Sequence, residues 1–286
     1  MQARLRRFVQ QKLVPGRYPR FGTDQLHAAL TKVAINRNAT LFVHTAWDEF
    51  YNFDGTALTL IRALQNQVGP GGTIAMPAYP LAIDPSKVFD VLRTPTGAGM
   101  VPELFRRMRG VERSINLYHS VAAYGPAATL LIRDHILSST PWDRFSPYAR
   151  LADLDANILC LGLPRSFGLG TSMHCPESLL YDEIPYFRKV FGSEIPYRYR
   201  DRSGTVGDLR IRPRTGRWSA TRVLGHIDPR EVRVTYVSNL RIQAIGARYL
   251  TNRMVELARH GIVNYYWPLP WPRLFKVADR DAVEKA

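Results

Sequence analysis

The sequence predicts an α/β fold in three layers, with a mixed, mostly parallel sheet flanked by helices. Three observations support this prediction. A strand, a helix and a strand follow one another within residues 39–76, which is typical of a parallel βαβ unit. Further strand and helix patterns alternate as far as about residue 180. The last hundred residues instead alternate polar and apolar positions, which predicts an added antiparallel, β-rich C-terminal part.

The first elements carry recognisable start and stop signals. Thr23 and Asp24 are N-cap residue types ahead of a helix that we expect to run to about Ile35. Residues 39–44 form an apolar run typical of a buried strand. A second helix is expected to open at residues 54–56 and to stop at the glycines of 69–72, followed by a strand at 73–76. Further predicted elements are a loop at 80–97, helices at 101–108 and 128–137, and strands at 120–125 and 155–163.

The remaining elements follow a glycine-rich loop. This loop, residues 165–171, comes directly after the 155–163 strand, and Thr171 or Ser172 is expected to cap the next helix. Pro176 fits only the first turn of that helix. Antiparallel strands are predicted within 198–204, 205–218 and 231–245, and a helix at 251–261. We expect residues 1–22 to form a basic N-terminal arm and residues 23–286 to form a single domain.

The charge balance favours anionic partners. The chain has 39 Lys and Arg against 24 Asp and Glu, a formal net charge of +15. Such a field attracts nucleic acid, acidic lipid or phosphate-bearing small molecules and repels polycations. A solvated, arginine-rich surface is an equally good explanation, because net charge alone says nothing about the fold.

Several protein classes are excluded by pattern. No run reaches the roughly 18 apolar residues of a membrane span, and the charged first residues lack the apolar core of a secretory signal. Two cysteines do not make a disulfide framework, which favours a cytoplasmic location. The seven histidines show no metal-ligand spacing, so no metal site is expected, and the short nucleotide-binding and hydrolase signatures are absent.

Three histidines fall at the ends of predicted elements: His44, His119 and His174. His174 and Glu177 are three positions apart and share a face of the predicted helix. A carboxylate there can orient the imidazole and raise its basicity, so the pair is a candidate general base. The spacing alone is also compatible with a His–Glu contact that is only structural or lies on the surface.

Two further features have competing interpretations. Cys175 neighbours His174, but adjacent helix residues point about 100° apart, so a buried, inert thiol is favoured over a nucleophile. The loop 69–73 resembles a phosphate cradle, yet it stops one helix and starts a strand. The helix start at Gly55 and Thr56 is the better candidate anion site, because free N–H groups there favour phosphate.

Five segments, in order, resemble motifs of the aminoglycoside 3-N-acetyltransferase family, the antibiotic N-acetyltransferase-like enzymes. They run from a strand ending in His44 to a glycine loop followed by Thr-x-x-His-x-x-Glu. Each piece is modest, but five pieces in the right order are specific. The segments are residues 41–50, 57–79, 96–125, 145–151 and 161–177.

The resemblance implies direct acetyl transfer from acetyl-coenzyme A to an amine in a ternary complex, without a covalent acyl-enzyme. His174, oriented by Glu177, is then the general base. Oxyanion donors are expected at Thr45, the Ala78 backbone region or Ser120, and His119 would shape the thioester site. Pantetheine would lie along residues 44–45, with its phosphates near residues 55–56. The implied cofactor-binding residues are His44, Thr45, Gly55, Thr56, Ala78, His119 and Ser120.

The charge bears on the acceptor. Aminoglycoside-binding enzymes need acidic pockets for several ammonium groups, whereas arginine forks suit phosphate. We therefore expect a small-molecule amine that is anionic, such as an amino sugar linked to a nucleotide or phosphate, and no nucleic acid partner. One alternative is an aminoglycoside 3-N-acetyltransferase that confers antibiotic resistance. Another is a non-catalytic family member that binds anionic partners, and a homo-oligomer is left open. The arginines concerned are Arg198, Arg200, Arg202, Arg210, Arg212, Arg214 and Arg217.

Overall fold

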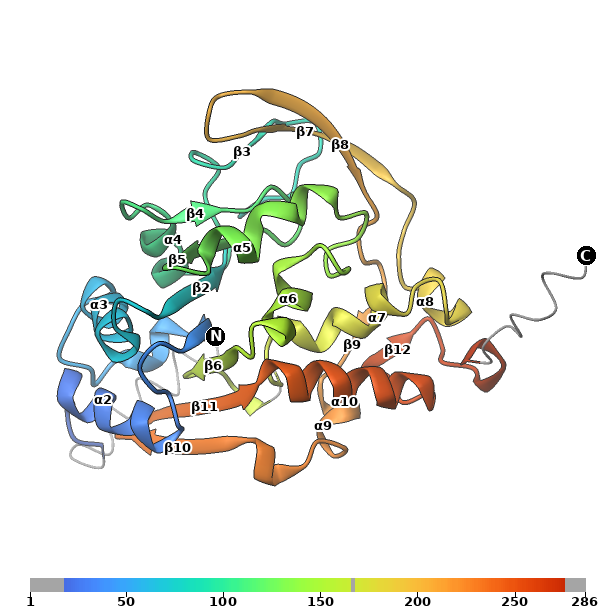
Figure 1. Ribbon diagram of the computed structural model, residues 1–286. Helices are drawn as coiled ribbons and strands as arrows, with labels where there is room; N and C mark the ends of the chain where they lie inside the picture. Colours follow the sequence, from blue (N-terminus) through green and yellow to red (C-terminus); the bar gives the residue numbers. More distant parts are fainter. Residues whose placement is uncertain (1–17, 166–167, 276–286) are drawn as a thin grey trace, which may run out of the picture.

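A seven-stranded sheet forms the centre of the molecule (Figure 1). The computed structural model describes residues 18–165 and 168–275. Most of the predicted basic arm therefore lies outside the described residues, and the division into arm and domain stays a prediction. Across the sheet the strand order is β10 (Arg233–Val237), β11 (Leu240–Gly246), β6 (Asn157–Leu161), β1 (Thr40–Thr45), β2 (Thr73–Pro77), β5 (Val121–Tyr124) and β4 (Glu112–Arg113).

The middle of this sheet is parallel. β1 pairs in parallel with β2 on one side and with β6 on the other, as the βαβ pattern predicts. β5 and β11 are antiparallel to their neighbours, so β4 and β10 point the same way as the central three strands. Five strands (β6, β1, β2, β4 and β10) therefore share one direction, which confirms the predicted mixed, mostly parallel sheet.

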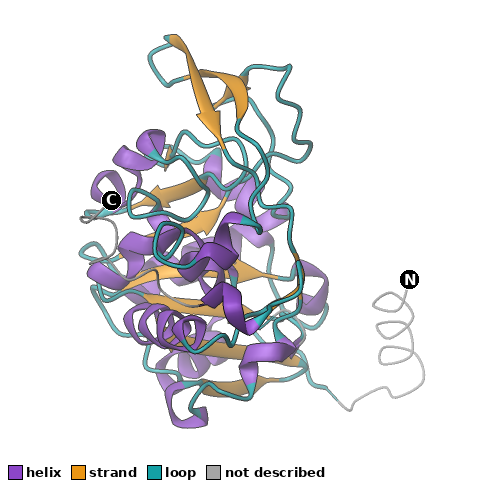
Figure 2. Ribbon diagram, turned by 90° about the vertical axis from the view of Figure 1, so that its right-hand side faces the viewer, coloured by secondary structure: helices purple, strands orange, loops and turns teal. Residues whose placement is uncertain are grey.

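Helices cover both faces of the sheet (Figures 1 and 2). Strand β1 shows why, because its apolar residues alternate between the two layers: Leu41 and Val43 pack on one side and Phe42 on the other. The first layer contains α2 (Thr23–Lys32), α3 (Ala57–Val68) and α4 (Met100–Arg106). The second contains α5 (Ala128–Ile132), α6 (Pro147–Asp153), α7 (Cys175–Leu179) and α10 (Ala247–Arg259).

Two predicted helix starts differ from the structure. Helix α2 is capped by Gly22 rather than by Thr23 or Asp24, because the chain enters through a bridge between Phe21 and Phe53 and Gly22 is extended. The segment after the glycine loop begins as a 3-10 helix, η4 (Thr171–His174), preceded by Gly170, and α7 follows directly. Neither Thr171 nor Ser172 caps it, because both belong to the helical turn itself.

The predicted antiparallel C-terminal part is divided among three sheets. β10 and β11 extend the central sheet. The hairpin β7 (Ile195–Arg200) and β8 (Val206–Ile211) pairs with β3 (Phe89–Asp90), a short strand inside the predicted 80–97 loop, and projects from the body in Figure 2. β9 (Arg217–Trp218) pairs with β12 (Tyr265–Trp267). Shorter helices are η1 (Trp47–Phe50), η2 (Arg133–Leu137), α8 (Pro185–Arg188), α9 (Thr221–Leu224), η5 (Pro229–Glu231) and η6 (Pro272–Phe275).

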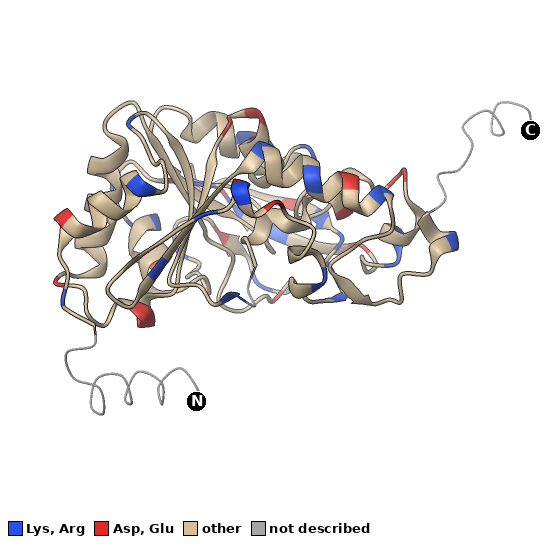
Figure 3. Ribbon diagram, turned by 90° about the horizontal axis from the view of Figure 1, so that it is seen from below, with Lys and Arg blue, Asp and Glu red and all other residues tan. Residues whose placement is uncertain are grey.

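Charge and hydropathy add two observations. In Figure 3, Lys and Arg are spread over helices, strands and loops of the described chain. Within residues 18–165 and 168–275, no helix is both long and apolar enough to cross a bilayer.

Candidate active site

His174 and Glu177 form a buried hydrogen-bonded pair at the start of α7. The distance between His174 Nδ1 and Glu177 Oε1 is 2.7 Å, and the two residues are 4% and 1% exposed. The predicted i, i+3 spacing therefore brings the imidazole and the carboxylate together. Since the carboxylate holds Nδ1, the other ring nitrogen, Nε2, is the one available for proton transfer.

The backbone before η4 explains the position of this pair. Gly170 has a φ of +90°, and a Cβ there would lie 2.5 Å from His44 Nε2, so only glycine lets the turn approach β1 so closely. His44 Nε2 accepts a hydrogen bond from the Thr171 N–H at 3.3 Å. The carboxyl end of β1 is thereby tied to the short helix that carries His174.

Aromatic rings surround the His174 imidazole. Trp142 stacks on it with ring centroids 4.9 Å apart, and Trp218 meets it edge-on at 4.7 Å. Trp142 also contacts His119, with centroids 4.5 Å apart. The indole of Trp142, which is fully buried, therefore joins the predicted base and the predicted thioester-site histidine in one cluster.

Arg214 brings a positive charge to this cluster. Its Nη1 lies 3.2 Å from His174 Nε2 and 3.5 Å from His174 Nδ1. The guanidinium carbon also lies 5.5 Å from the centroid of Trp142 and 5.4 Å from that of Trp218, within cation–π range of both rings.

Burial and Arg214 together set the proton affinities. Burial, and then the charge of Arg214, hold the pKa of His174 well below its usual 6.5, so the imidazole is neutral near pH 7. Burial raises the pKa of Glu177 to about 8, although Arg214, Tyr265 and Asn264 oppose this by favouring the carboxylate. Asn264 Nδ2 and the Tyr265 hydroxyl lie 3.3 and 3.5 Å from His174 Nδ1, so they face the same side of the ring as Glu177.

Several polar atoms of the cluster are buried and have no hydrogen-bond partner among the residues that the structure describes. They are His119 Nδ1, Trp142 Nε1, Tyr148 Oη and Glu177 Oε2. Tyr148 is fully buried and its ring lies 6.1 Å from that of His119. Because an unpaired buried polar atom costs free energy, such a concentration indicates a place where a bound molecule supplies the missing partners.

Of the other predicted cofactor-binding residues, His44 and Thr45 lie at the carboxyl end of β1. His44 is 4% exposed, and burial lowers its pKa to about 4. Thr45 is partly buried and lies in register with Leu161 of β6. Both residues therefore lie at the carboxyl end of a central strand, where His44 contacts the first residue of η4.

Gly55 and Thr56 occupy the start of α3, on the other side of the sheet. The Thr56 hydroxyl caps this helix by accepting the Thr59 N–H at 3.1 Å. A Cβ at Gly55 would lie 2.7 Å from the Phe53 ring. The described contacts of both residues are local, and none joins them to the His174 cluster.

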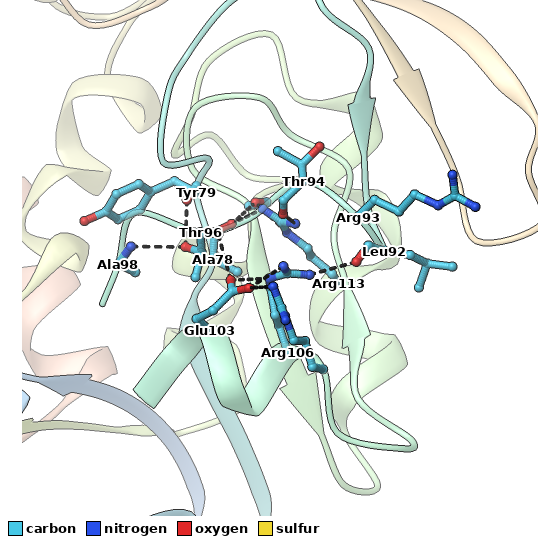
Figure 4. Close-up of polar contacts among 12 residues, drawn as sticks. Ala78, Tyr79, Leu92, Arg93, Thr94, Thr96, Ala98, Glu103, Arg106 and Arg113 are labelled. Atoms are coloured by element: carbon cyan, nitrogen blue, oxygen red, sulfur yellow. Dashed lines mark hydrogen bonds and ion pairs between the residues drawn. The ribbon is translucent and has the colours of Figure 1, made fainter. Parts of the chain in front are cut away.

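Ala78 and Ser120 are bonded to each other. The Ala78 N–H donates to the Ser120 carbonyl at 2.7 Å, and the Ser120 hydroxyl donates to the Ala78 carbonyl at 2.7 Å. Arg113 also donates to the Ala78 carbonyl, as Figure 4 shows, and to the Ser120 hydroxyl at 3.2 Å. The two donors expected to stabilise an oxyanion are thus committed to structural hydrogen bonds, and their catalytic role stays a prediction.

Two arginine-lined cavities lie beside the carboxyl end of β6. One, of about 290 Å³, is lined by Glu49, Gly162 and Asn239 among others, and the second has a volume of about 420 Å³. Arg165 and Arg241 line both. Guanidinium groups at such a site suit a phosphate-bearing ligand.

Sequence reasoning missed most of the residues around His174. Trp142 lies three positions before the family-like segment 145–151, and this proximity could have indicated that it belongs to the site. Arg214 was noted only for its charge. Asn264, Tyr265 and Trp218 come from segments whose sequence gives no local sign of this site. Among the described residues, no three His, Cys, Asp or Glu side chains are grouped to hold a metal ion.

Comparison with known proteins supports the resemblance. The chain is 32% identical over 164 residues to aminoglycoside N(3)-acetyltransferase IV of Salmonella sp, covering 57% of this chain and 60% of that protein. The enzyme named aminoglycoside N(3)-acetyltransferase VIII of Streptomyces fradiae is 32% identical over 158 residues, covering 47% of this chain and 54% of that protein. The chain thus spans little more than half the length of these relatives.

Solved structures share the fold. The chain resembles AAC-IIIb in its binary complex with CoASH with a TM-score of 0.72 at 23% identity, covering 85% of this chain and 98% of that one. A mutant of the aminoglycoside acetyltransferase AAC(3)-IVa in complex with a gentamicin gives a TM-score of 0.69 at 23% identity, covering 85% and 91%. Finally, the family model for aminoglycoside 3-N-acetyltransferase matches residues 42–256. Because that match covers well over half of its length, the chain belongs to the aminoglycoside 3-N-acetyltransferase family.

Proposed function

We propose that the protein is an acetyl-coenzyme A-dependent N-acetyltransferase that acylates an amino group of an amino sugar by direct transfer. The observation that carries this proposal is the buried 2.7 Å contact between His174 Nδ1 and Glu177, which makes Nε2 the nitrogen that accepts the amine proton once Arg214, 3.2 Å away, gives up its hydrogen bond to it. Family membership supports the same reaction. Its relatives carry the name of that activity.

The proton transfers follow from this arrangement. Once Glu177 is ionised, as the pH rises through its raised pKa of about 8, it accepts the Nδ1–H, and His174 Nε2 accepts the proton that the attacking amine loses. An N–C bond to the acetyl group forms, the C–S bond breaks, and the proton held on His174 is available to the departing thiolate. Glu177 stabilises the imidazolium while it exists, which is why a buried carboxylate at this place aids catalysis.

The residues present fit the co-substrate. Bound acetyl-coenzyme A supplies an activated thioester acyl group. Trp142 Nε1 and Tyr148 Oη are buried donors that lack partners beside His174 and His119, and they suit an acyl oxygen on which negative charge develops. Arg165 and Arg241, which line both cavities beside the carboxyl end of β6, suit the phosphates of coenzyme A.

Two acceptor classes compete. The names of the relatives, and solved complexes of similar fold with a gentamicin and with apramycin, support an aminoglycoside. This evidence favours the aminoglycoside alternative over the anionic amino sugar expected from charge. In either case the nucleophile is an amine of a small molecule and the base is the same.

A thiol-release assay with acetyl-coenzyme A tests the proposal. Wild type is expected to release thiol only when an amine such as gentamicin, apramycin or glucosamine is added. His174→Ala should reduce turnover by about 10²–10⁴-fold, the usual contribution of a general base, with unchanged affinity for coenzyme A by calorimetry. Full turnover by His174→Ala would contradict the assigned base. No amine-dependent release, together with salt-sensitive binding to DNA, would favour the non-catalytic alternative instead.

A further inference from the structure

The environment of the base contains a positive charge that the reaction does not require. Arg214 Nη1 lies 3.2 Å from His174 Nε2, the atom that would receive the proton of the amine. A protonated His174 beside Arg214 places two positive charges in contact. Any acceptor must therefore enter a site whose charge opposes both an ammonium group and the imidazolium formed during transfer.

The backbone on both sides fixes Arg214 in this place. Arg214 forms a bridge with Phe191, and the Pro213 carbonyl accepts the Gly192 N–H at 2.8 Å. The Thr215 and Gly216 N–H groups both donate to the Val190 carbonyl, at 2.9 and 3.0 Å. The indoles of Trp142 and Trp218 then hold the guanidinium. These contacts make Arg214 a built part of the site rather than a solvated surface side chain.

Arg214 has no carboxylate partner of its own. Within residues 18–165 and 168–275, no ion pair or hydrogen bond joins Arg214 to an acidic side chain, and its guanidinium contacts the His174 ring, although its charge also favours the ionised form of Glu177. Glu177 is the neighbouring acid, but its Oε1 is bonded to His174. When His174 takes a proton, the single carboxylate of Glu177 faces two positive charges, those of His174 and Arg214, so one of them remains uncompensated.

We infer that Arg214 selects acceptors that carry a carboxylate or phosphate near the reacting amine, and that it disfavours polycationic aminoglycosides. This inference rests on the proposed N-acetyltransferase function and, from Arg214, names an acceptor class for it that differs from the aminoglycosides of the relatives. An anionic group on the acceptor pairs with the guanidinium, orients the amine toward Nε2 and offsets the charge that remains when the proton is transferred. A polyammonium acceptor gains none of these contacts and adds like-charge repulsion.

The test compares amines that differ in charge. Values of kcat/KM are measured for glucosamine, muramic acid (a carboxylate), glucosamine 6-phosphate and apramycin. In wild type the two anionic sugars are expected to exceed glucosamine by about tenfold or more, the value of one charge-assisted pair, and apramycin to fall below it. The order of muramic acid and the phosphate distinguishes the two anion sources.

Three variants isolate Arg214. Arg214→Gln should reduce the preference for anionic over neutral amines to about one, and Arg214→Lys should keep part of it. Arg212→Gln removes the same charge two residues away, where Arg212 pairs with Glu194 at 3.4 Å, and should leave the preference unchanged. Affinities of the same amines for His174→Ala, with and without Arg214→Gln, are measured in parallel by calorimetry.

The outcomes separate this inference from the proposed function. Efficient acetylation of apramycin with no advantage for anionic sugars overturns the selectivity and leaves the enzyme assignment intact. An equal loss for every amine in Arg214→Gln also overturns it, because it shows a general role in folding or chemistry. Arg214-dependent binding of anionic sugars without any acetylation supports the selectivity and overturns the proposed function.

Discussion

Two clusters of charge in this molecule, one partly buried around Glu103 and one buried around His174, are built in opposite ways. Around Glu103, the carboxylate is paired: Arg106 donates to both its oxygens at 2.6 Å, and the Thr96 N–H adds a bond of 2.9 Å (Figure 4). Arg113 beside it has no carboxylate partner among the described residues, but it donates to the Thr94 carbonyl at 2.6 Å. Around His174, Arg214 lacks a carboxylate, and polar atoms of Trp142 and Glu177 lack hydrogen bonds. The first cluster is complete as it stands, and the second is not.

The pKa values of Glu103 and Glu177 differ in the same way. Burial alone would raise the pKa of Glu103, but its bonds from Arg106 and Thr96 and the nearby arginine charges lower it to about 2. Burial dominates at Glu177 and raises its pKa to about 8. We call the Glu103 cluster closed, because its carboxylate is fully hydrogen-bonded, and the His174 cluster open, because some of its polar atoms are not bonded within the described part of the chain. A closed cluster stabilises the structure, here the loop beside β2, whereas an open cluster keeps polar atoms available to a ligand.

The largest expected effect lies in the closed cluster. Glu103→Ala leaves the Arg106 guanidinium, whose side chain is 2% exposed, buried without its carboxylate. We expect a loss of about 3–5 kcal/mol in the free energy of unfolding, measured by urea denaturation. Glu112→Ala is a matched control, because Glu112 only accepts from the Thr129 hydroxyl, and it should cost less than about 1 kcal/mol. Equal losses in both variants would remove the distinction between the clusters.

The next effect lies in the open cluster and concerns activity. Glu177→Gln keeps the shape of the side chain but cannot stabilise an imidazolium. Turnover should therefore fall, by less than the ~10²–10⁴-fold expected when the base itself is removed. Near pH 4.5, where the raised pKa keeps the carboxyl protonated in the folded state, stability should change by no more than about 1 kcal/mol, because glutamine keeps the oxygen that contacts His174 Nδ1. A large loss of stability with normal activity of the folded fraction would assign Glu177 a structural role.

The pH dependence of stability should have opposite signs in the two clusters. Unfolded glutamate titrates near 4.5, so Glu103 contributes stability above that pH and loses it as the pH falls toward 2. Glu177 keeps its proton in the folded state up to about pH 8, so wild type loses stability relative to Glu177→Gln as the pH rises from 4.5 to 8. Denaturant midpoints of wild type, Glu103→Gln and Glu177→Gln across this range give both slopes. Slopes of the same sign would contradict the comparison.

The same contrast explains what could be predicted from sequence. The elements β1, α3, β2 and β6 follow from apolar runs and from capping by Thr56 and Gly69, which are local signals. The His174–Glu177 pair is also local, because three positions on a helix bring the side chains together. Arg214 and Asn264 reach His174 from 40 and 90 positions away, and no periodicity encodes such a contact. The His174–Glu177 contact was therefore predictable, but the charge and rings around it were not.

The smallest expected effect is at Cys175, which lies between His174 and Glu177 in sequence. Its thiol is fully buried, and burial, followed by the neighbouring Glu177, raises its pKa, so the reactive thiolate is disfavoured. Cys175→Ala should cost about 1 kcal/mol of stability through lost packing and keep most of the turnover, and native protein should resist thiol titration. Cys160, which is buried and has a raised pKa of about 12, provides the matched variant Cys160→Ala. If Cys175→Ala alone were folded but inactive, the acetyl group would pass through a thioester on the enzyme, and the role of His174 would be to activate sulfur rather than the amine.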